Sequence, residues 1–79
     1  MTNVPVMIVP KDAPNGEWLI QFFSSDMKKV IYEKTGSVNV QCDPQGVIDE
    51  GKIWFEKNKE SITNELKEIV KNPELVLQN

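Results

Sequence analysis

Apolar and polar positions divide the chain into short predicted strands followed by one long predicted helix. Residues 4–9 are apolar and largely β-branched, and residues 17–23 are apolar on both faces, which predicts two strands. The Asn-Gly pair at 15–16 favours a hairpin loop between them, because both residue types accept positive φ. We expect 17–23 to be a central strand, with a helix on one face and a loop, the tail or a second subunit on the other.

The segment 24–35 is ambiguous between a helix and a strand. A helix over 25–35 would begin at Ser25 and be followed by Gly36, whereas a strand over 29–34 would follow a turn. The β-branched and aromatic run 30–32 favours the strand. In that interpretation residues 34–36 form a turn closed by a glycine bulge.

A strictly alternating segment at 37–42 predicts a half-buried strand, with Val38, Val40 and Cys42 facing inward. Cys42 is the one cysteine, so an intrachain disulfide is excluded. We interpret Cys42 as a small buried apolar side chain.

The second half of the chain predicts a long amphipathic helix over 44–71. Asp43 is suited to cap it, Pro44 to begin it, and the Asn72-Pro73 pair to end it. Helical spacing puts most of its apolar residues on one stripe, namely Val47, Ile48, Trp54, Phe55, Ile62, Leu66, Ile69 and Val70. Ile53 points to the opposite side.

The length of this helix poses a problem. It would measure about 42 Å, whereas six-residue strands span only about 20 Å. Either the helix breaks near residues 58–61, or its overhang, including Ile53, packs on another molecule. Gly46 and Gly51 within it either weaken the helix or allow a close backbone approach.

These elements predict an α+β fold: an antiparallel meander of three or four strands, covered on one face by the long C-terminal helix. Residues 74–78 are a last strand or a docked tail. We expect one domain over 1–79, with flexible ends at about 1–3 and 78–79. The strand–strand–strand–helix order over residues 6–55 resembles HicB-type antitoxin domains in topology. That family's Pro-Gly-Cys-type turn is absent, so no residue role is carried over.

Composition argues against several chemistries. The chain has no histidine, its nine basic residues are all lysines, and its net charge is −3. Catalytic pairs built on histidine are therefore excluded, and the helix carboxylates fit a solvated face balanced by lysines. We expect neither an enzyme nor a cofactor or metal site. No apolar run reaches the roughly 20 residues of a membrane span, so we expect a soluble cytoplasmic protein.

The remaining prediction is a small non-enzymatic binding or regulatory protein that acts through protein–protein contacts. An inhibitor, an antitoxin-like or phage-type regulator, or an assembly factor would fit, with another protein or a second copy as partner. The reason for this prediction is that the chain has more apolar surface than one small core needs. The candidate contact residues are Ile53, Trp54, Leu75, Leu77, Leu19 and Phe23.

An alternative is a nucleic-acid-binding module made of the sheet and the helix. Lys28, Lys29 and Lys34 with Tyr32 would supply a basic and aromatic surface. The acidic net charge and the absence of arginine disfavour it.

Overall fold

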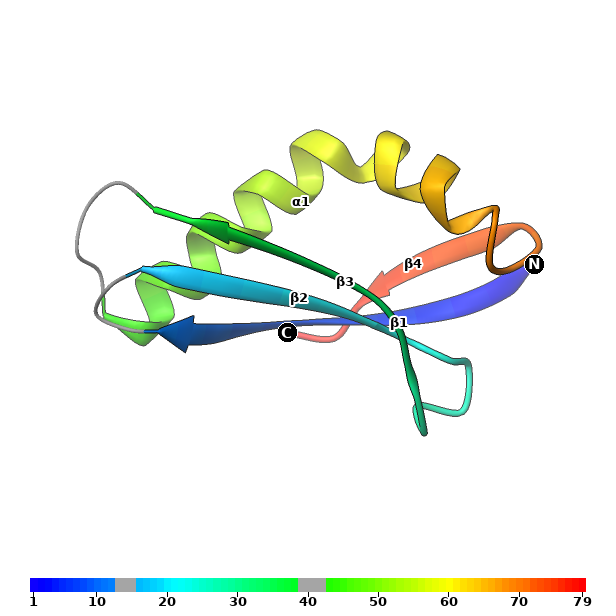
Figure 1. The fold of residues 1–79 in the computed structure, drawn as a ribbon, viewed down its shortest axis with the longest axis horizontal. Helices are drawn as coiled ribbons and strands as arrows, with labels where there is room; N and C mark the ends of the chain where they lie inside the picture. Colours follow the sequence, from blue (N-terminus) through cyan, green and yellow to red (C-terminus); the bar gives the residue numbers. More distant parts are fainter. Residues whose placement is uncertain (13–15, 39–42) are drawn as a thin grey trace.

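The described residues form a mixed four-stranded sheet with one helix packed on one of its faces, and Figure 1 shows this arrangement. The computed structural model describes residues 1–12, 16–38 and 43–79. Its elements are β1 (Thr2–Asp12), β2 (Glu17–Phe23), β3 (Val30–Ser37), α1 (Pro44–Leu66) and β4 (Pro73–Leu77). The strand order across the sheet is β3-β2-β1-β4. The α+β class is therefore confirmed.

The purely antiparallel meander is wrong, because β4 pairs with β1 in parallel. The first three strands do form antiparallel neighbours. The physical reason is the return path of the chain. After β3, α1 crosses back over the sheet, so the chain enters β4 in the direction in which β1 runs.

The helix is one continuous element that ends five residues earlier than predicted. The Asp43 carboxylate accepts a hydrogen bond from the Gly46 N–H at 2.8 Å, which confirms the predicted cap. No break occurs at 58–61. After Leu66 the chain turns, with the N–H groups of Ile69 and Val70 both donating to the Leu66 carbonyl. This turn is needed because Thr2 pairs with Pro73, which brings the start of β4 beside the start of β1.

The length problem is removed by a strand longer than predicted. At 11 residues, β1 spans about 36 Å, and the 23 residues of α1 span about 34 Å. The helix therefore lies within the length of its sheet and arches over it (Figure 1). β1 begins at Thr2, within the segment expected to be loose. At the other end, the Asn79 side chain donates to and accepts from the main chain of Ile8.

The strand interpretation of 29–34 is confirmed, and the helix alternative is wrong. The predicted turn at 34–36 is also wrong, since β3 continues through Gly36 to Ser37. The Trp18 ring lies over Gly36, where a Cβ atom would come within 2.3 Å of it. The glycine therefore makes room for an indole instead of closing a turn. Residues 39–42, with the predicted burial of Val40 and Cys42, lie outside the described residues.

The core lies between the sheet and α1. Burial alternates along β2, so that Trp18, Ile20 and Phe22 face the helix. The other buried apolar residues are Val4, Val6 and Ile8 of β1, Val47, Phe55, Ile62 and Leu66 of α1, and Leu75 of β4. No helix in the described parts of the chain is long and apolar enough to cross a membrane.

Candidate functional site

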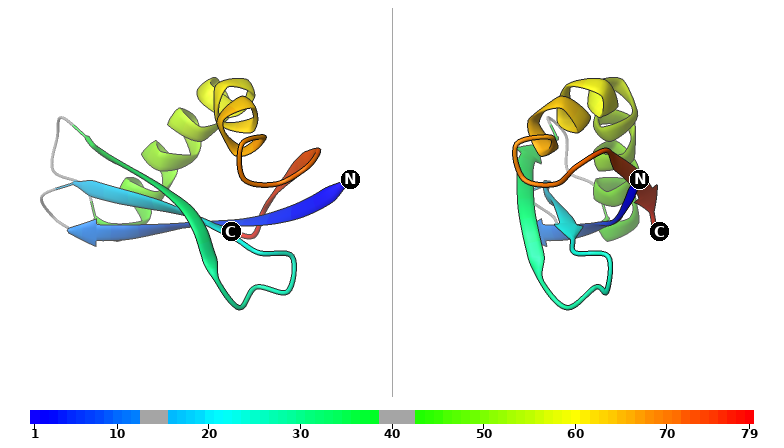
Figure 2. Two further views of the ribbon diagram at one scale, coloured as in Figure 1. Left: turned by 45° about the vertical axis from the view of Figure 1, so that its right-hand side comes forward. Right: turned by 90° about the vertical axis from the view of Figure 1, so that its right-hand side faces the viewer.

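The sheet face turned away from α1 carries a group of apolar side chains. Met7 and Val9 of β1 and Leu19 and Phe23 of β2 alternate with the core residues and are half-buried, although no described segment covers them. Val76 of β4 borders them and is 40% exposed. Figure 2 shows α1 on one side of the sheet and the β2–β3 hairpin tip turned to the other. We call this surface, defined by these five residues, the open sheet face.

Two of the predicted contact residues, Leu19 and Phe23, belong to the open sheet face. Polar side chains share it, with Gln21 opposite both Met7 and Glu33 in the strand register. The composition of 17–23 indicated two apolar faces. Sequence reasoning missed Met7 and Val9, although the uninterrupted apolar run 4–9 puts apolar side chains on both faces of its strand.

Ile53 and Trp54 lie elsewhere, on the flank of α1. Trp54 packs on Trp18, with ring centroids 5.0 Å apart, while Ile53 is 49% exposed. A hollow of about 190 Å³ opens there between α1 and the end of β3. Its lining residues are Trp18, Ser37, Val38, Glu50, Ile53, Trp54 and Lys57.

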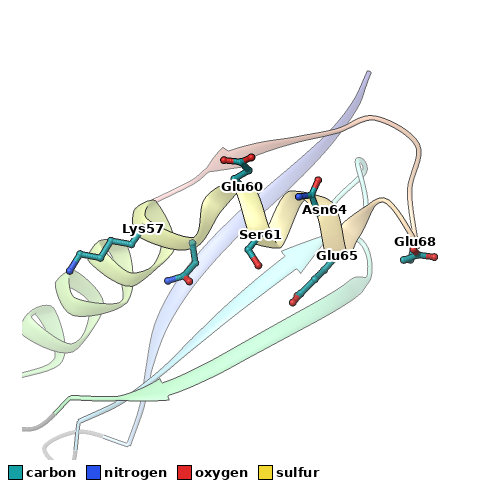
Figure 3. Close-up of a pocket in the computed structure, with 7 residues that line it drawn as sticks. Lys57, Glu60, Ser61, Asn64, Glu65 and Glu68 are labelled. Atoms are coloured by element: carbon teal, nitrogen blue, oxygen red, sulfur yellow. The ribbon is translucent and has the colours of Figure 1, made fainter.

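A second hollow continues along the same helix flank. It measures about 690 Å³ and is open and polar, and Lys57 lines both hollows. Its lining residues are Lys57, Asn58, Glu60, Ser61, Asn64, Glu65 and Glu68. In Figure 3 Ser61 and Glu65 point from α1 toward the sheet, whereas Glu60 and Asn64 point away from it. We call the two hollows together the helix-flank groove.

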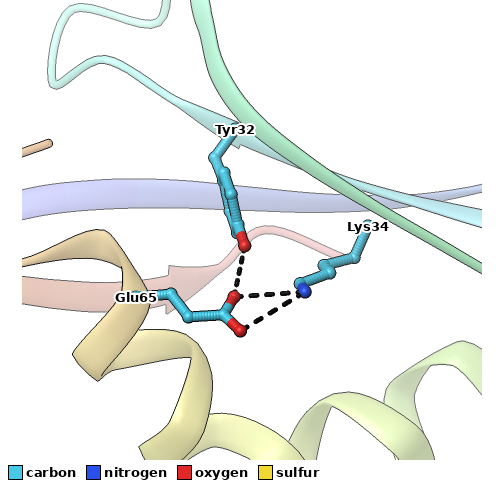
Figure 4. A network of polar contacts seen from close by, with 3 residues as sticks. All are labelled: Tyr32, Lys34 and Glu65. Carbon is cyan, nitrogen blue, oxygen red and sulfur yellow. Dashed lines mark hydrogen bonds and ion pairs between the residues drawn. The ribbon is translucent and has the colours of Figure 1, made fainter. Parts of the chain in front are cut away.

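A polar tie joins α1 to β3 beside this groove (Figure 4). The Tyr32 hydroxyl donates to Glu65, whose carboxylate also lies 3.1 Å from the Lys34 ammonium. The hydrogen bond from Tyr32, together with that from Lys34, lowers the pKa of the Glu65 carboxyl. The bond to Glu65 in turn raises the pKa of Lys34. The Lys34 side chain is 31% exposed and that of Glu65 41%, so water screens the ion pair and the tie contributes little to stability.

The residues of the nucleic-acid alternative do not form one surface. Tyr32 and Lys34 face α1 and are engaged by Glu65, and the Tyr32 ring packs on Phe22 at 5.6 Å. Lys28 and Lys29 lie in the exposed hairpin tip between β2 and β3. A cationic groove beside aromatic rings, which single-stranded nucleic acid requires, is not formed by these four residues.

The last two predicted contact residues face the helix. Leu75 is buried in the core and Leu77 packs against it from the partly exposed end of β4. The segment is thus the fourth strand, and Leu75 and Leu77 are its contribution to the core. The sequence signal for this was the alternation of Leu75 and Leu77 around Val76, which points to the open sheet face.

Within the described ranges no three cysteine, aspartate or glutamate side chains gather as metal ligands. Comparison with protein-family models, with curated proteins and with solved structures found no match to this chain.

Proposed function

We propose that this chain is a small, non-enzymatic regulatory protein of the cytoplasm that acts by binding another protein or a second copy of itself. The observation that carries the proposal is the open sheet face. Antiparallel strands that face solvent normally carry polar side chains on that side. Here Met7, Val9, Leu19 and Phe23 occupy those positions.

Covering this face provides a driving force for association. Each Å² of apolar surface removed from water contributes about 25 cal/mol. The core of this small domain lies between the sheet and α1. The apolar side chains of the open sheet face lie on the other side of the sheet and are not part of that core. A contiguous apolar patch of this kind is typical of a protein–protein contact.

The nucleic-acid alternative receives no comparable support. Lys34 and Tyr32 are held by Glu65, and the chain carries a net charge of −3. A phosphate backbone would be repelled by the acidic helix at moderate salt.

The test replaces the two β2 residues of the open sheet face, Leu19 and Phe23. In the double variant Leu19→Thr with Phe23→Thr, threonine keeps the strand propensity while removing apolar surface. We expect the parent protein to form a stoichiometric complex, with itself in sedimentation equilibrium or with one protein captured from the native host. The double variant loses that complex.

A matched control is Thr35→Ser, on β3 and on the same sheet face but outside the apolar positions. It should leave the complex intact, and circular dichroism should show all three proteins folded. A monomeric parent with no stoichiometric partner, or a complex that survives the double variant unchanged, contradicts the proposal.

A further inference from the structure

The helix-flank groove has an apolar end and an acidic end. At the apolar end, the exposed Ile53 lies beside the rings of Trp18 and Trp54, which contact each other at a tilt of 41°. Along the remaining length, Glu60, Glu65 and Glu68 line the hollow, opposed by Lys57. The groove is therefore complementary to a ligand with one apolar group and several positive charges.

Strand β3 meets this groove at Ser37, which lines its apolar end, and at Tyr32 and Lys34, which contact Glu65. It is also the outermost strand of the sheet. The Val38 N–H donates to the Gly16 carbonyl, so Gly36, Lys34 and Tyr32 also direct their main-chain groups toward β2. By the same alternation, Glu33, Thr35 and Ser37 direct theirs toward the free edge. An uncovered row of amides and carbonyls pairs readily with an extended peptide.

We propose that the helix-flank groove binds a basic, extended segment of a partner protein, which pairs with the free edge of β3. One apolar side chain of that segment packs against Trp54 and Ile53. Lysine or arginine side chains at alternate positions reach Glu50, which lines the hollow with Trp54, and Glu68 at the other end. The inference rests on the proposed protein-binding function, but it uses a surface separate from the open sheet face.

The lengths of β3 and α1 along the groove agree with this arrangement. Along β3, the distance from Gly36, beneath Trp18, to Tyr32, which bonds Glu65, is about 13 Å. Along α1, Trp54 and Glu65 are about 16 Å apart. Side chains on one face of an added strand recur at about 6.6 Å. One apolar and two basic side chains therefore span the groove.

Charge argues against a second copy as the occupant. The segment that fits must be basic, whereas the chain has 12 acidic and 9 basic residues. Its own edge strand β3 carries Glu33 beside Lys34 and has no net charge. A copy of this chain would bring no cationic strand to the groove.

The test uses a synthetic peptide and the intrinsic fluorescence of the protein. Both tryptophans of the sequence, Trp18 and Trp54, line the groove, so their emission reports its occupancy. The peptide is Thr-Lys-Thr-Lys-Thr-Leu-Thr-Lys-Thr-Lys-Thr with blocked ends, which presents the same pattern in either strand direction. One control peptide has glutamate in place of every lysine. A second has proline in place of the two central threonines and cannot pair as a strand.

We expect the lysine peptide to shift the emission to shorter wavelength with a Kd on the order of 100 µM, since a short flexible peptide loses much entropy on ordering. Neither control peptide should shift it. The variant Glu50→Lys with Glu68→Lys should weaken binding about tenfold, whereas Glu56→Lys with Glu74→Lys, which changes the charge equally outside the groove, should weaken it less than about twofold.

A third variant addresses strand pairing directly. Thr35→Pro removes an N–H at the free edge, where proline is tolerated, and thermal melting checks that the fold is kept. It should abolish the peptide response. The proposal is overturned by no shift with the lysine peptide at millimolar concentration, or by equal shifts with the glutamate or proline peptide. A shift that appears on concentrating the protein alone identifies a second copy as occupant and also overturns it.

The experiments distinguish a groove that binds no peptide from a protein that has no protein partner at all. The tryptophans lie on the helix side of the sheet, so binding at the open sheet face does not cover them. A complex lost in the Leu19→Thr with Phe23→Thr variant, together with no peptide response, would leave the protein-binding function standing and remove only this groove.

Discussion

Trp18 sets the local geometry of both the core and the groove. Its ring lies over Gly36 on one side, contacts Trp54 at 5.0 Å between centroids, and leaves space for Gly51 of α1. A Cβ atom at Gly51 would come within 2.8 Å of the Ile8 side chain and 3.3 Å of the Trp18 ring. The large indole on β2 thus requires residues without side chains on β3 and α1.

Gly51→Ala therefore reverses the usual effect of this substitution in a helix. Alanine would normally stabilise a helix interior by about 1 kcal/mol relative to glycine. Here overpacking against Ile8 should outweigh this gain and lower the free energy of unfolding by about 1–2 kcal/mol. Urea denaturation measures the change. Asn64→Ala, on the exposed face of the same helix, is the control and should be neutral or stabilising; a stabilised Gly51→Ala would show that the helix stands off the sheet.

The elements α1 and β3 are joined at their surfaces by the Tyr32–Lys34–Glu65 tie. Since the hydrogen bond from Tyr32 lowers the pKa of the Glu65 carboxyl, the folded state binds its proton more weakly than the unfolded chain does. The stability that the tie contributes is therefore present above the unfolded-state pKa. It is lost as the pH falls through the lower folded-state value.

Glu65→Gln should remove the pH-dependent contribution of the tie to stability. We expect its denaturation midpoint to lie slightly below that of the parent at pH 7, and the difference to disappear between about pH 5 and pH 3, where glutamate titrates. Urea midpoints measured across this range test it. Tyr32→Phe removes the largest cause of the shift and should give the same convergence, whereas a midpoint difference that persists at pH 3 would assign the effect to packing.

For the whole molecule, the mixed sheet places β1 between two neighbours and leaves β3 at an edge. Val4 and Val6 of β1 are fully buried and pair with β4, and the Val6 carbonyl accepts from the Gln78 N–H. Among the described residues, no strand lies beyond the outward amides of β3. Protection against hydrogen exchange should therefore fall sharply from the centre of the sheet to this edge.

Amide exchange followed by NMR measures this gradient. The N–H groups of Val4 and Val6 should exchange at least about a thousandfold more slowly than those of Thr35 and Ser37. The reason is that the hydrogen bonds of Val4 and Val6 break only on global unfolding. Lys34 and Tyr32, which direct their N–H groups toward β2, serve as the internal control and should be protected. Equal protection of Thr35 would show that the edge of β3 is already covered.

Local patterns were sufficient to predict most of the elements. The cap at Asp43, the alternation of 17–23 and the β-branched run at 30–32 depend on neighbours within a few residues, so local patterns predict them. The predicted stripe of α1 holds up to Leu66, whereas Ile69 lies beyond the helix and is 49% exposed. The same alternation identified Leu19 and Phe23 as apolar positions outside the helix-covered face.

Tertiary structure decided what depends on residues far apart in the chain. Gly36 resembles a turn residue until Trp18 is placed over it, and α1 resembles an overhanging helix until β1 extends to 11 residues. The parallel pairing of β4 with β1 joins the two ends of the chain and leaves no local signature. Helix caps and side-chain periodicity depend on residues that are close in the sequence, so the sequence alone determines them. The position of the helix-flank groove beside β3 depends on how α1 packs across the whole sheet, so only the tertiary structure determines it.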